Sequence, residues 1–163
     1  MTSPAFGLAA ALMIADGCAA ALARKFLALP IRVTDWFHLA LHLDDGVVLG
    51  TLPMDKVGAA YWTLAVVAPI WMVWGVVTTP WLVDRVGYAL VLAGLVGNAA
   101  RRLRGPVPDY FGVGPLAGDT WLFFNVADVT AVAGFLFLSG AFARAILKGG
   151  RRAPGRRGGL GQR

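Results

Sequence analysis

The sequence predicts an all-α integral membrane protein, with four transmembrane helices and a small extracytoplasmic β-sheet between the first and second helices. Its hydrophobic fraction is 58% and its mean hydropathy is +0.66, whereas soluble domains are about 45–50% apolar. Charged residues make up 15% of the chain, against about 25% in a soluble domain. Four segments are also apolar over the roughly 20 residues that cross a bilayer. A soluble fold of 163 residues could not bury this much apolar surface.

Charged residues and prolines mark the ends of the predicted spans. Arg24 and Lys25 close the first span, and Pro80 follows the second. Pro69 lies inside the second span and is expected to kink it, which membrane helices tolerate. The four spans cover approximately residues 5–29, 58–77, 81–100 and 126–147.

A β-strand pattern follows the first span. Residues 36–43 alternate in polarity in the manner of a strand rather than a helix. Asp44, Asp45 and Gly46 form a turn signal, and residues 47–49 are suited to a returning strand. These features predict a small sheet on the membrane surface.

Basic residues predict how the chain is oriented. The last sixteen residues carry six positive charges and no acid, and they directly follow an apolar span. A basic patch can bind nucleic acid, but beside a span it is typical of a cytoplasmic flank, so we do not expect nucleic-acid binding. Four spans then place both termini in the cytoplasm.

This orientation also divides the chain into regions. Residues 1–148 form the predicted transmembrane domain, with extracytoplasmic segments at about 30–57 and 101–124, and residues 149–163 form a basic, disordered cytoplasmic tail. The second extracytoplasmic segment contains three arginines, Arg101, Arg102 and Arg104. Arginines in an extracytoplasmic segment are contrary to the positive-inside rule, which places basic residues on the cytoplasmic side. Either the orientation is inverted or these arginines act at the outer interface. The basic C-terminal tail is longer and contains no acid, so it favours the second alternative.

Polar residues in or beside the spans are the candidates for chemistry, because such groups are costly in a bilayer. Asp16, Asn98 and Asp128 lie within spans, and Asp109 lies between the last two. If the third and fourth helices are antiparallel, Asn98, Asp109, Asn125 and Asp128 gather at one level. Two carboxylates in a poorly solvated site can share a proton and serve as base and acid. This is the chemistry of aspartic proteases.

Each candidate also has a purely structural interpretation. Asn125 and Asp128 have the spacing of a capping box. Asp109 follows a proline and could be a turn residue, and Asn98 could be a helix C-cap. Asp16 could pair with a basic residue, whether at the end of the first span or in the outer segment. The arginines of that segment could bind lipid phosphates.

The histidines and the cysteine do not predict a metal site or a disulfide. His38 and His42 lie about 13 Å apart at the rise of a strand, which is too far for one ion. Cys18 is the sole cysteine, so an intramolecular disulfide is excluded. No Ser-His-Asp arrangement or phosphate-binding loop is evident in the sequence.

Two motifs are similar to those of the bacterial lipoprotein signal peptidases (signal peptidase II). Residues 97–110, from Gly-Asn to Gly-Pro-Val-Pro-Asp-Tyr, resemble the family's Gly-Asn, Asp-Arg and Gly-x-Val-x-Asp-Phe signature. Residues 124–128, followed by Gly134, resemble its Phe-Asn-x-Ala-Asp motif. Asp16 matches the family's first-helix Asp, and residues 43–50 resemble its Arg-Asn-x-Gly-Ala-Ala-Phe segment.

The resemblance implies a membrane aspartic endopeptidase that removes signal peptides from diacylglyceryl-modified prolipoproteins, cutting just before the lipidated Cys. Asp109 and Asp128 would be the catalytic pair. The residues that would position the substrate and this pair, or support them, are Asn98, Arg102, Asn125, Asp16 and Asp44. No metal or organic cofactor would be needed.

The resemblance also implies partners, location and fold. Its partners would be lipidated prolipoproteins and membrane lipids, and globomycin-type cyclic peptides would inhibit the enzyme. The protein would function as a monomer. The protein would lie in the bacterial cytoplasmic (inner) membrane, with its active site near the outer face. The fold would combine four transmembrane helices with an extracytoplasmic sheet and a short surface helix.

The chain departs from the family pattern at several positions. Arg101 stands where the family has the Asp of its Asp-Arg pair, Asp44 where it has Asn, Leu49 where it has Phe, and Ala20 where it has Lys. These departures motivate an alternative, a divergent non-catalytic relative that binds lipopeptides or lipid. A third hypothesis is a structural membrane protein whose acids only cap helices and pair with arginines. Capping alone does not explain why both motifs occur together.

Overall fold

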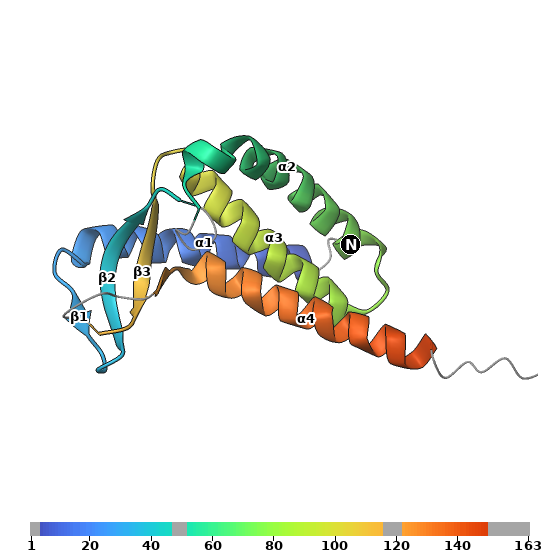
Figure 1. Cartoon of the computed structure of the whole chain (residues 1–163). Coiled ribbons are helices and arrows are strands. Elements are labelled where there is room, and N and C mark those ends of the chain that lie inside the picture. The colour runs from blue at the N-terminus through green and yellow to red at the C-terminus, as the bar shows by residue number, and fades with distance from the viewer. Residues whose placement is uncertain (1–3, 47–51, 116–121, 150–163) are drawn as a thin grey trace, which may run out of the picture.

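Four long helices make up most of the computed structural model, which describes residues 4–46, 52–115 and 122–149. The helices are α1 (Pro4–Phe26), α2 (Met54–Thr78), α3 (Leu82–Arg102) and α4 (Val126–Gly149) (Figure 1). All four are long and apolar enough to cross a membrane. The predicted spans are therefore confirmed to within a few residues, and α2 continues through Pro69.

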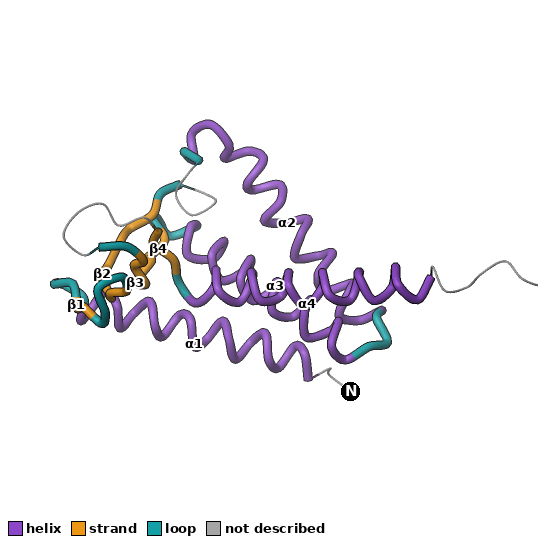
Figure 2. The backbone as a smooth tube through the Cα atoms, turned by 60° about the horizontal axis from the view of Figure 1, so that its bottom comes forward, coloured by secondary structure: helices purple, strands orange, loops and turns teal. Residues whose placement is uncertain are grey.

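Helix α3 is the centre of the bundle, and it packs against each of the other three helices. Helix α2 diverges from the rest, so that it leans away from α4 and α1 (Figure 2). Large apolar side chains are exposed along the helices, for example Ile14, Trp71 and Phe135. Such surface is unfavourable in water, but it matches the hydrocarbon of a bilayer.

Glycines let α3 and α4 approach closely. A Cβ added at Gly94 would lie 2.7 Å from the Cβ of Ala131, and one added at Gly134 would lie 2.6 Å from the backbone nitrogen of Val91. Small residues at helix contacts are typical of membrane bundles, where van der Waals packing drives association. The close contact fixes the start of α4 beside the end of α3.

Gly134→Ala is expected to lower stability by about 1–3 kcal/mol, the usual cost of overpacking. The added methyl group would meet backbone atoms of Val91 and Gly87, at 2.6 and 2.7 Å, which cannot move without shifting α3. Gly7→Ala is the matched control, because a Cβ there meets nothing within 4 Å. Thermal unfolding in detergent measures both variants. Equal melting temperatures would contradict the close packing of α3 and α4.

The sheet has four antiparallel strands in the order β1-β2-β3-β4. Strands β1 (Ile31–Arg32) and β2 (Phe37–Asp44) lie between α1 and α2, so the predicted strand over 36–43 is confirmed. Strands β3 (Val107–Val113) and β4 (Leu122–Phe124) come from the segment between α3 and α4. Strand β3 was not predicted from the sequence, because its proline and glycine are typical of turns. The returning strand expected at 47–49 lies outside the described residues.

The sheet crosses the end of the bundle at which α1 and α3 finish and α4 begins (Figure 1). Strand β3 pairs with β2, so that Asp109 lies opposite His42 and Val107 lies opposite Asp44. This register brings the two extramembrane segments together over the helix ends. The short surface helix that the resemblance implied is not among the described elements, and residues 150–163 of the predicted tail are outside them.

Candidate active site

The first turn of α4 holds Asp128 by a reciprocal pair of hydrogen bonds. The backbone N–H of Asn125 donates to Asp128 Oδ2 at 3.0 Å, and the backbone N–H of Asp128 donates to Asn125 Oδ1 at 3.1 Å. These are the two bonds of a capping box. They fix the carboxylate at the N-terminus of α4, where the helix dipole favours negative charge.

Asp109 lies in strand β3, where its side chain is buried. The amide nitrogen Nδ2 of Asn125 donates to Asp109 Oδ1 at 2.6 Å. Asn125 is itself only 1% exposed, so it contacts both acids from a fixed position. The interpretation of Asp109 as a turn residue is therefore wrong.

Asn98 connects α3 to the same two residues of α4. Its Nδ2 donates to Asp128 Oδ1 at 2.7 Å, and its Oδ1 accepts a hydrogen bond from Asn125 Nδ2 at 3.2 Å. The C-cap of α3 is Leu103, so the interpretation of Asn98 as the C-cap is wrong. The structure thus brings Asn98, Asp109, Asn125 and Asp128 into one hydrogen-bonded cluster, called the carboxylate cluster below.

Burial changes the acidity of this cluster. The pKa of Asp109 is raised to about 7, chiefly by desolvation. The Asn125 hydrogen bond opposes this rise, and the negative charges of Asp128 and Asp44 contribute to it. Near neutral pH the Asp109 carboxyl is therefore a mixture of acid and carboxylate. Burial also raises the pKa of Tyr110 to about 12, so its hydroxyl remains a neutral hydrogen-bonding group.

Asp16 of α1 contacts the residues next to Asp109 and Asp128 in the chain. It forms an ion pair with Arg101, and it accepts hydrogen bonds from the hydroxyl of Tyr110 at 3.3 Å and the backbone N–H of Ala127 at 3.2 Å. The Tyr110 hydroxyl in turn accepts from the N–H of Val126 at 3.1 Å. Sequence analysis gave Tyr110 no role, although its place directly after Asp109 was a signal.

The partner of Asp16 is the residue that departs from the family pattern. Of the basic residues considered from the sequence, the structure selects Arg101 at the end of α3, rather than Arg24 or Lys25 at the end of α1. Both charged side chains are largely buried. Arg101 is thereby fixed between the helices, with its Nη2 donating to the Asp16 carboxylate.

A second ion pair joins Arg102 to Asp44, with 3.1 Å between Nη2 and Oδ2. Asp44 ends β2 and also accepts a hydrogen bond from the N–H of Gly46 at 2.9 Å. The guanidinium of Arg102 lies 5.6 Å from the ring centre of Tyr61, and its Nε is buried without a partner among the described residues. Arg102 therefore keeps an unused donor.

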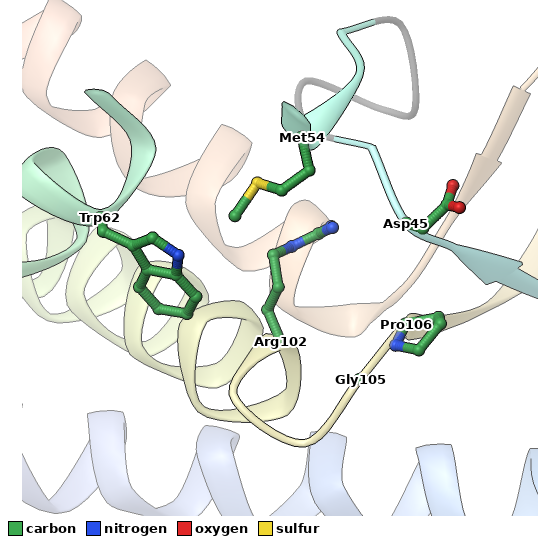
Figure 3. A pocket seen from close by; sticks show the side chains of 6 residues that line it. All are labelled: Asp45, Met54, Trp62, Arg102, Gly105 and Pro106. Atoms are coloured by element: carbon green, nitrogen blue, oxygen red, sulfur yellow. The ribbon is translucent and has the colours of Figure 1, made fainter. Parts of the chain in front are cut away.

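A cavity of about 380 Å³ lies beside this ion pair. Arg102 projects into its middle, with Met54 and Trp62 of α2 on one side and Asp45 and Pro106 on the other (Figure 3). The cavity thus combines apolar side chains with one guanidinium, between the sheet and the divergent end of α2. Such a lining suits a ligand with both apolar and polar parts.

Neither histidine takes part in the carboxylate cluster through the contacts that the structure describes. His38 is buried and packs edge-on against Phe123, and His42 stacks on the same ring at 4.5 Å between centres. In the described ranges, no three His, Cys, Asp or Glu side chains come together as metal ligands. Both rings instead contribute to the packing of the sheet.

The fold of this chain is similar to that of two solved bacterial membrane enzymes. One solved bacterial membrane enzyme has a TM-score of 0.73 and 19% identity, covering 98% of this chain and 96% of its own. A second solved bacterial membrane enzyme has a TM-score of 0.72 and 18% identity, and the match covers 87% of this chain and 94% of that enzyme. At these identities the likeness shows the fold alone.

The sequence comparisons identify the family. The family model described as signal peptidase (SPase) II matches residues 8–143. The lipoprotein signal peptidase of Nitrobacter hamburgensis is 36% identical over 119 residues, which are 66% of this chain and 70% of that protein. The lipoprotein signal peptidase of Rhodopseudomonas palustris is 36% identical over 128 residues, 72% and 73% of the two chains. The chain belongs to the signal peptidase II family, whose members are membrane proteases that remove signal peptides from lipoproteins.

Proposed function

We propose that this chain is an aspartic endopeptidase that cuts diacylglyceryl-modified prolipoproteins just before the lipidated Cys, with Asp109 and Asp128 as its catalytic pair. The observation that carries the proposal is the carboxylate cluster, in which the buried residue Asn125 donates a hydrogen bond to each carboxylate, from its side-chain Nδ2 to Asp109 and from its backbone N–H to Asp128. Two acids held in this way, one with a pKa near 7, can divide the roles of acid and base at neutral pH.

The proposed reaction has two steps, and in each step one proton moves through each of the two acids. Asp128, as carboxylate, takes a proton from a water molecule while the water oxygen attacks the scissile carbonyl carbon. Asp109, as acid, donates its proton to the carbonyl oxygen, which gives a gem-diol. Asp109 then recovers a proton from one hydroxyl, Asp128 protonates the amide nitrogen of the lipidated Cys, and the C–N bond breaks. The pair returns to its starting state.

The neighbouring residues are assigned supporting roles in this reaction. Asn98 and Asn125 hold the carboxylates through the hydrogen bonds of the cluster. Arg102, anchored by Asp44, lines the cavity that accepts part of the substrate and positions the substrate there through its positive charge. Asp16 positions the residues next to both acids.

The proposal includes an orientation in the membrane. The sheet and the carboxylate cluster lie at the outer face of the bacterial cytoplasmic membrane, and both termini lie in the cytoplasm. Residues 1–148 form the transmembrane peptidase domain, and residues 149–163 form a cytoplasmic tail. The enzyme works as a monomer without a cofactor, binds membrane lipids, and is inhibited by globomycin-type peptides.

A cleavage assay tests the function. The full chain in detergent is given a diacylglyceryl-modified prolipoprotein and, separately, the unlipidated precursor, and mass spectrometry identifies the new N-terminus. Cleavage before the Cys of the lipidated substrate alone is the expected result. If a folded protein binds the lipidated substrate without cutting it, the chain is instead a divergent, non-catalytic relative that binds lipopeptides.

The rate is expected to fall as the pH rises through about 7. Asp109 must carry a proton in the proposed step, and burial raises its pKa to about 7. The fall in kcat/KM above this pH reports an apparent value for the coupled pair. A profile of kcat/KM from pH 5 to 9 on a lipidated peptide measures it. A rate that keeps rising to pH 9 would contradict the role of Asp109 as the acid.

A further inference from the structure

A second cavity of about 380 Å³ lies where α1, the end of α3 and strand β3 meet. Three arginines line it, Arg24 from α1 and Arg101 and Arg104 from the end of α3 and the turn after it. Gly17 and Ala20 of α1 leave the space open. The cavity is separate from the one that contains Arg102, and no residue lines both.

The charges around this second cavity are not balanced. Asp16 pairs with Arg101, whereas Arg24 and Arg104 form no ion pair with any described carboxylate. Arg24 is held in place by a hydrogen bond from its Nη2 to the carbonyl oxygen of Pro106, at 3.2 Å. The Nη1 of Arg101 is buried and has no hydrogen-bond partner within the described part of the chain. The wall of the cavity therefore carries more positive than negative charge.

A stripe of exposed residues runs along α1 away from this cavity. Ala10, Ile14, Gly17 and Ala21 follow one another three or four residues apart, so they share one face of the helix. Ile14 is 68% exposed, and the other three are small. The surface beneath the arginines is therefore apolar and shallow, and it lies within a membrane-spanning helix.

We propose that the cavity binds the phosphate group of an anionic phospholipid, whose acyl chains lie along this stripe of α1. Guanidinium groups bind phosphate through paired hydrogen bonds, and three of them converge here. A phospholipid joins such a phosphate to hydrocarbon chains, which matches a basic cavity above an apolar stripe. Arg24 and Arg104 bind the phosphate oxygens, and the guanidinium of Arg101 adds positive charge to the wall of the cavity.

Lipid binding to the purified protein tests this proposal without any substrate. Delipidated protein is titrated with phosphatidylglycerol, and native mass spectrometry counts bound lipid. Each arginine near a membrane surface contributes about 1 kcal/mol, so Arg24→Gln together with Arg104→Gln is expected to weaken binding about 10- to 30-fold. Arg32→Gln is the matched control, because Arg32 is an exposed arginine elsewhere at the same end of the bundle. It is expected to change binding by less than about twofold.

Other probes identify which part of the lipid is recognised. Ala21→Phe leaves every charge in place but fills the cavity, and it is expected to weaken binding as strongly as loss of the two arginines. Diacylglycerol, which has the chains without the phosphate, is expected to bind far more weakly. Equal phosphatidylglycerol binding by all variants, or equal binding of diacylglycerol, would overturn the proposal. If millimolar inorganic phosphate displaced the lipid, the cavity would be a binding site for free anions, and the phospholipid proposal would be overturned.

Discussion

Asp109→Asn is expected to lower the cleavage rate by roughly 10²- to 10⁴-fold, the range that one positioned acid–base group supplies. The introduced amide keeps the size of the side chain, and its oxygen can still accept the hydrogen bond from Asn125 Nδ2. What it lacks is the acidic proton that Asp109 donates to the scissile carbonyl oxygen. Single-turnover cleavage of a lipidated peptide measures the loss, and Asp128→Asn is expected to be equally slow.

Stability separates this loss of activity from misfolding. Because burial raises the pKa of Asp109 to about 7, the folded state binds the proton more tightly than the unfolded chain. The parent therefore loses stability as the pH rises from about 4 to about 7. An amide never ionises, so Asp109→Asn should melt no lower than the parent at pH 8. A variant that is inactive and also melts much lower at pH 8 would indicate a structural role instead.

Arg101→Gln is expected to destabilise the protein by about 3–5 kcal/mol, because removing one member of a buried ion pair leaves the other charge uncompensated. Asp16 is 3% exposed, and Arg101 is its charged partner. The other hydrogen bonds that Asp16 accepts come from the Tyr110 hydroxyl and the Ala127 backbone N–H, and neither group carries a positive charge. Unfolding by heat or denaturant in detergent measures the effect.

The double variant distinguishes a charge effect from a loss of packing. Asp16→Asn combined with Arg101→Gln removes both charges and should recover most of the stability lost by Arg101→Gln alone. Arg144→Gln is the control, because Arg144 pairs with Asp84 at 3.1 Å but is 53% exposed, and exposed pairs contribute about 0–1 kcal/mol. If the loss of stability in the double variant equalled the sum of the losses in Asp16→Asn and Arg101→Gln, the two residues would not be a coupled pair.

These ion pairs account for two of the departures from the family pattern. Arg101 stands where an acid is expected, and its charge is balanced by Asp16 from α1. Asp44 stands where an amide is expected, and it forms an ion pair with Arg102. Both substitutions thus create charge pairs inside this chain, next to a carboxylate cluster that keeps all four of its residues.

The four spans, strand β2 and the residues of the carboxylate cluster could all be predicted from the sequence. Spans follow from length and hydropathy, because a bilayer accepts only long apolar helices. The capping box was readable because its two residues are three apart on one turn. The membership in the signal peptidase II family was likewise recognisable from the two short motifs.

Contacts between residues far apart in the chain could not be predicted in this way. Strand β3 looked like a turn in the sequence, and its place in the sheet depends on pairing with β2, more than 60 residues earlier in the chain. The choice of Arg101 over Arg24 as partner of Asp16 depends on how α1 and α3 pack. The link from Tyr110 to Asp16 spans 94 residues. Sequence patterns report local geometry, whereas such contacts exist only once helices and sheet are packed together.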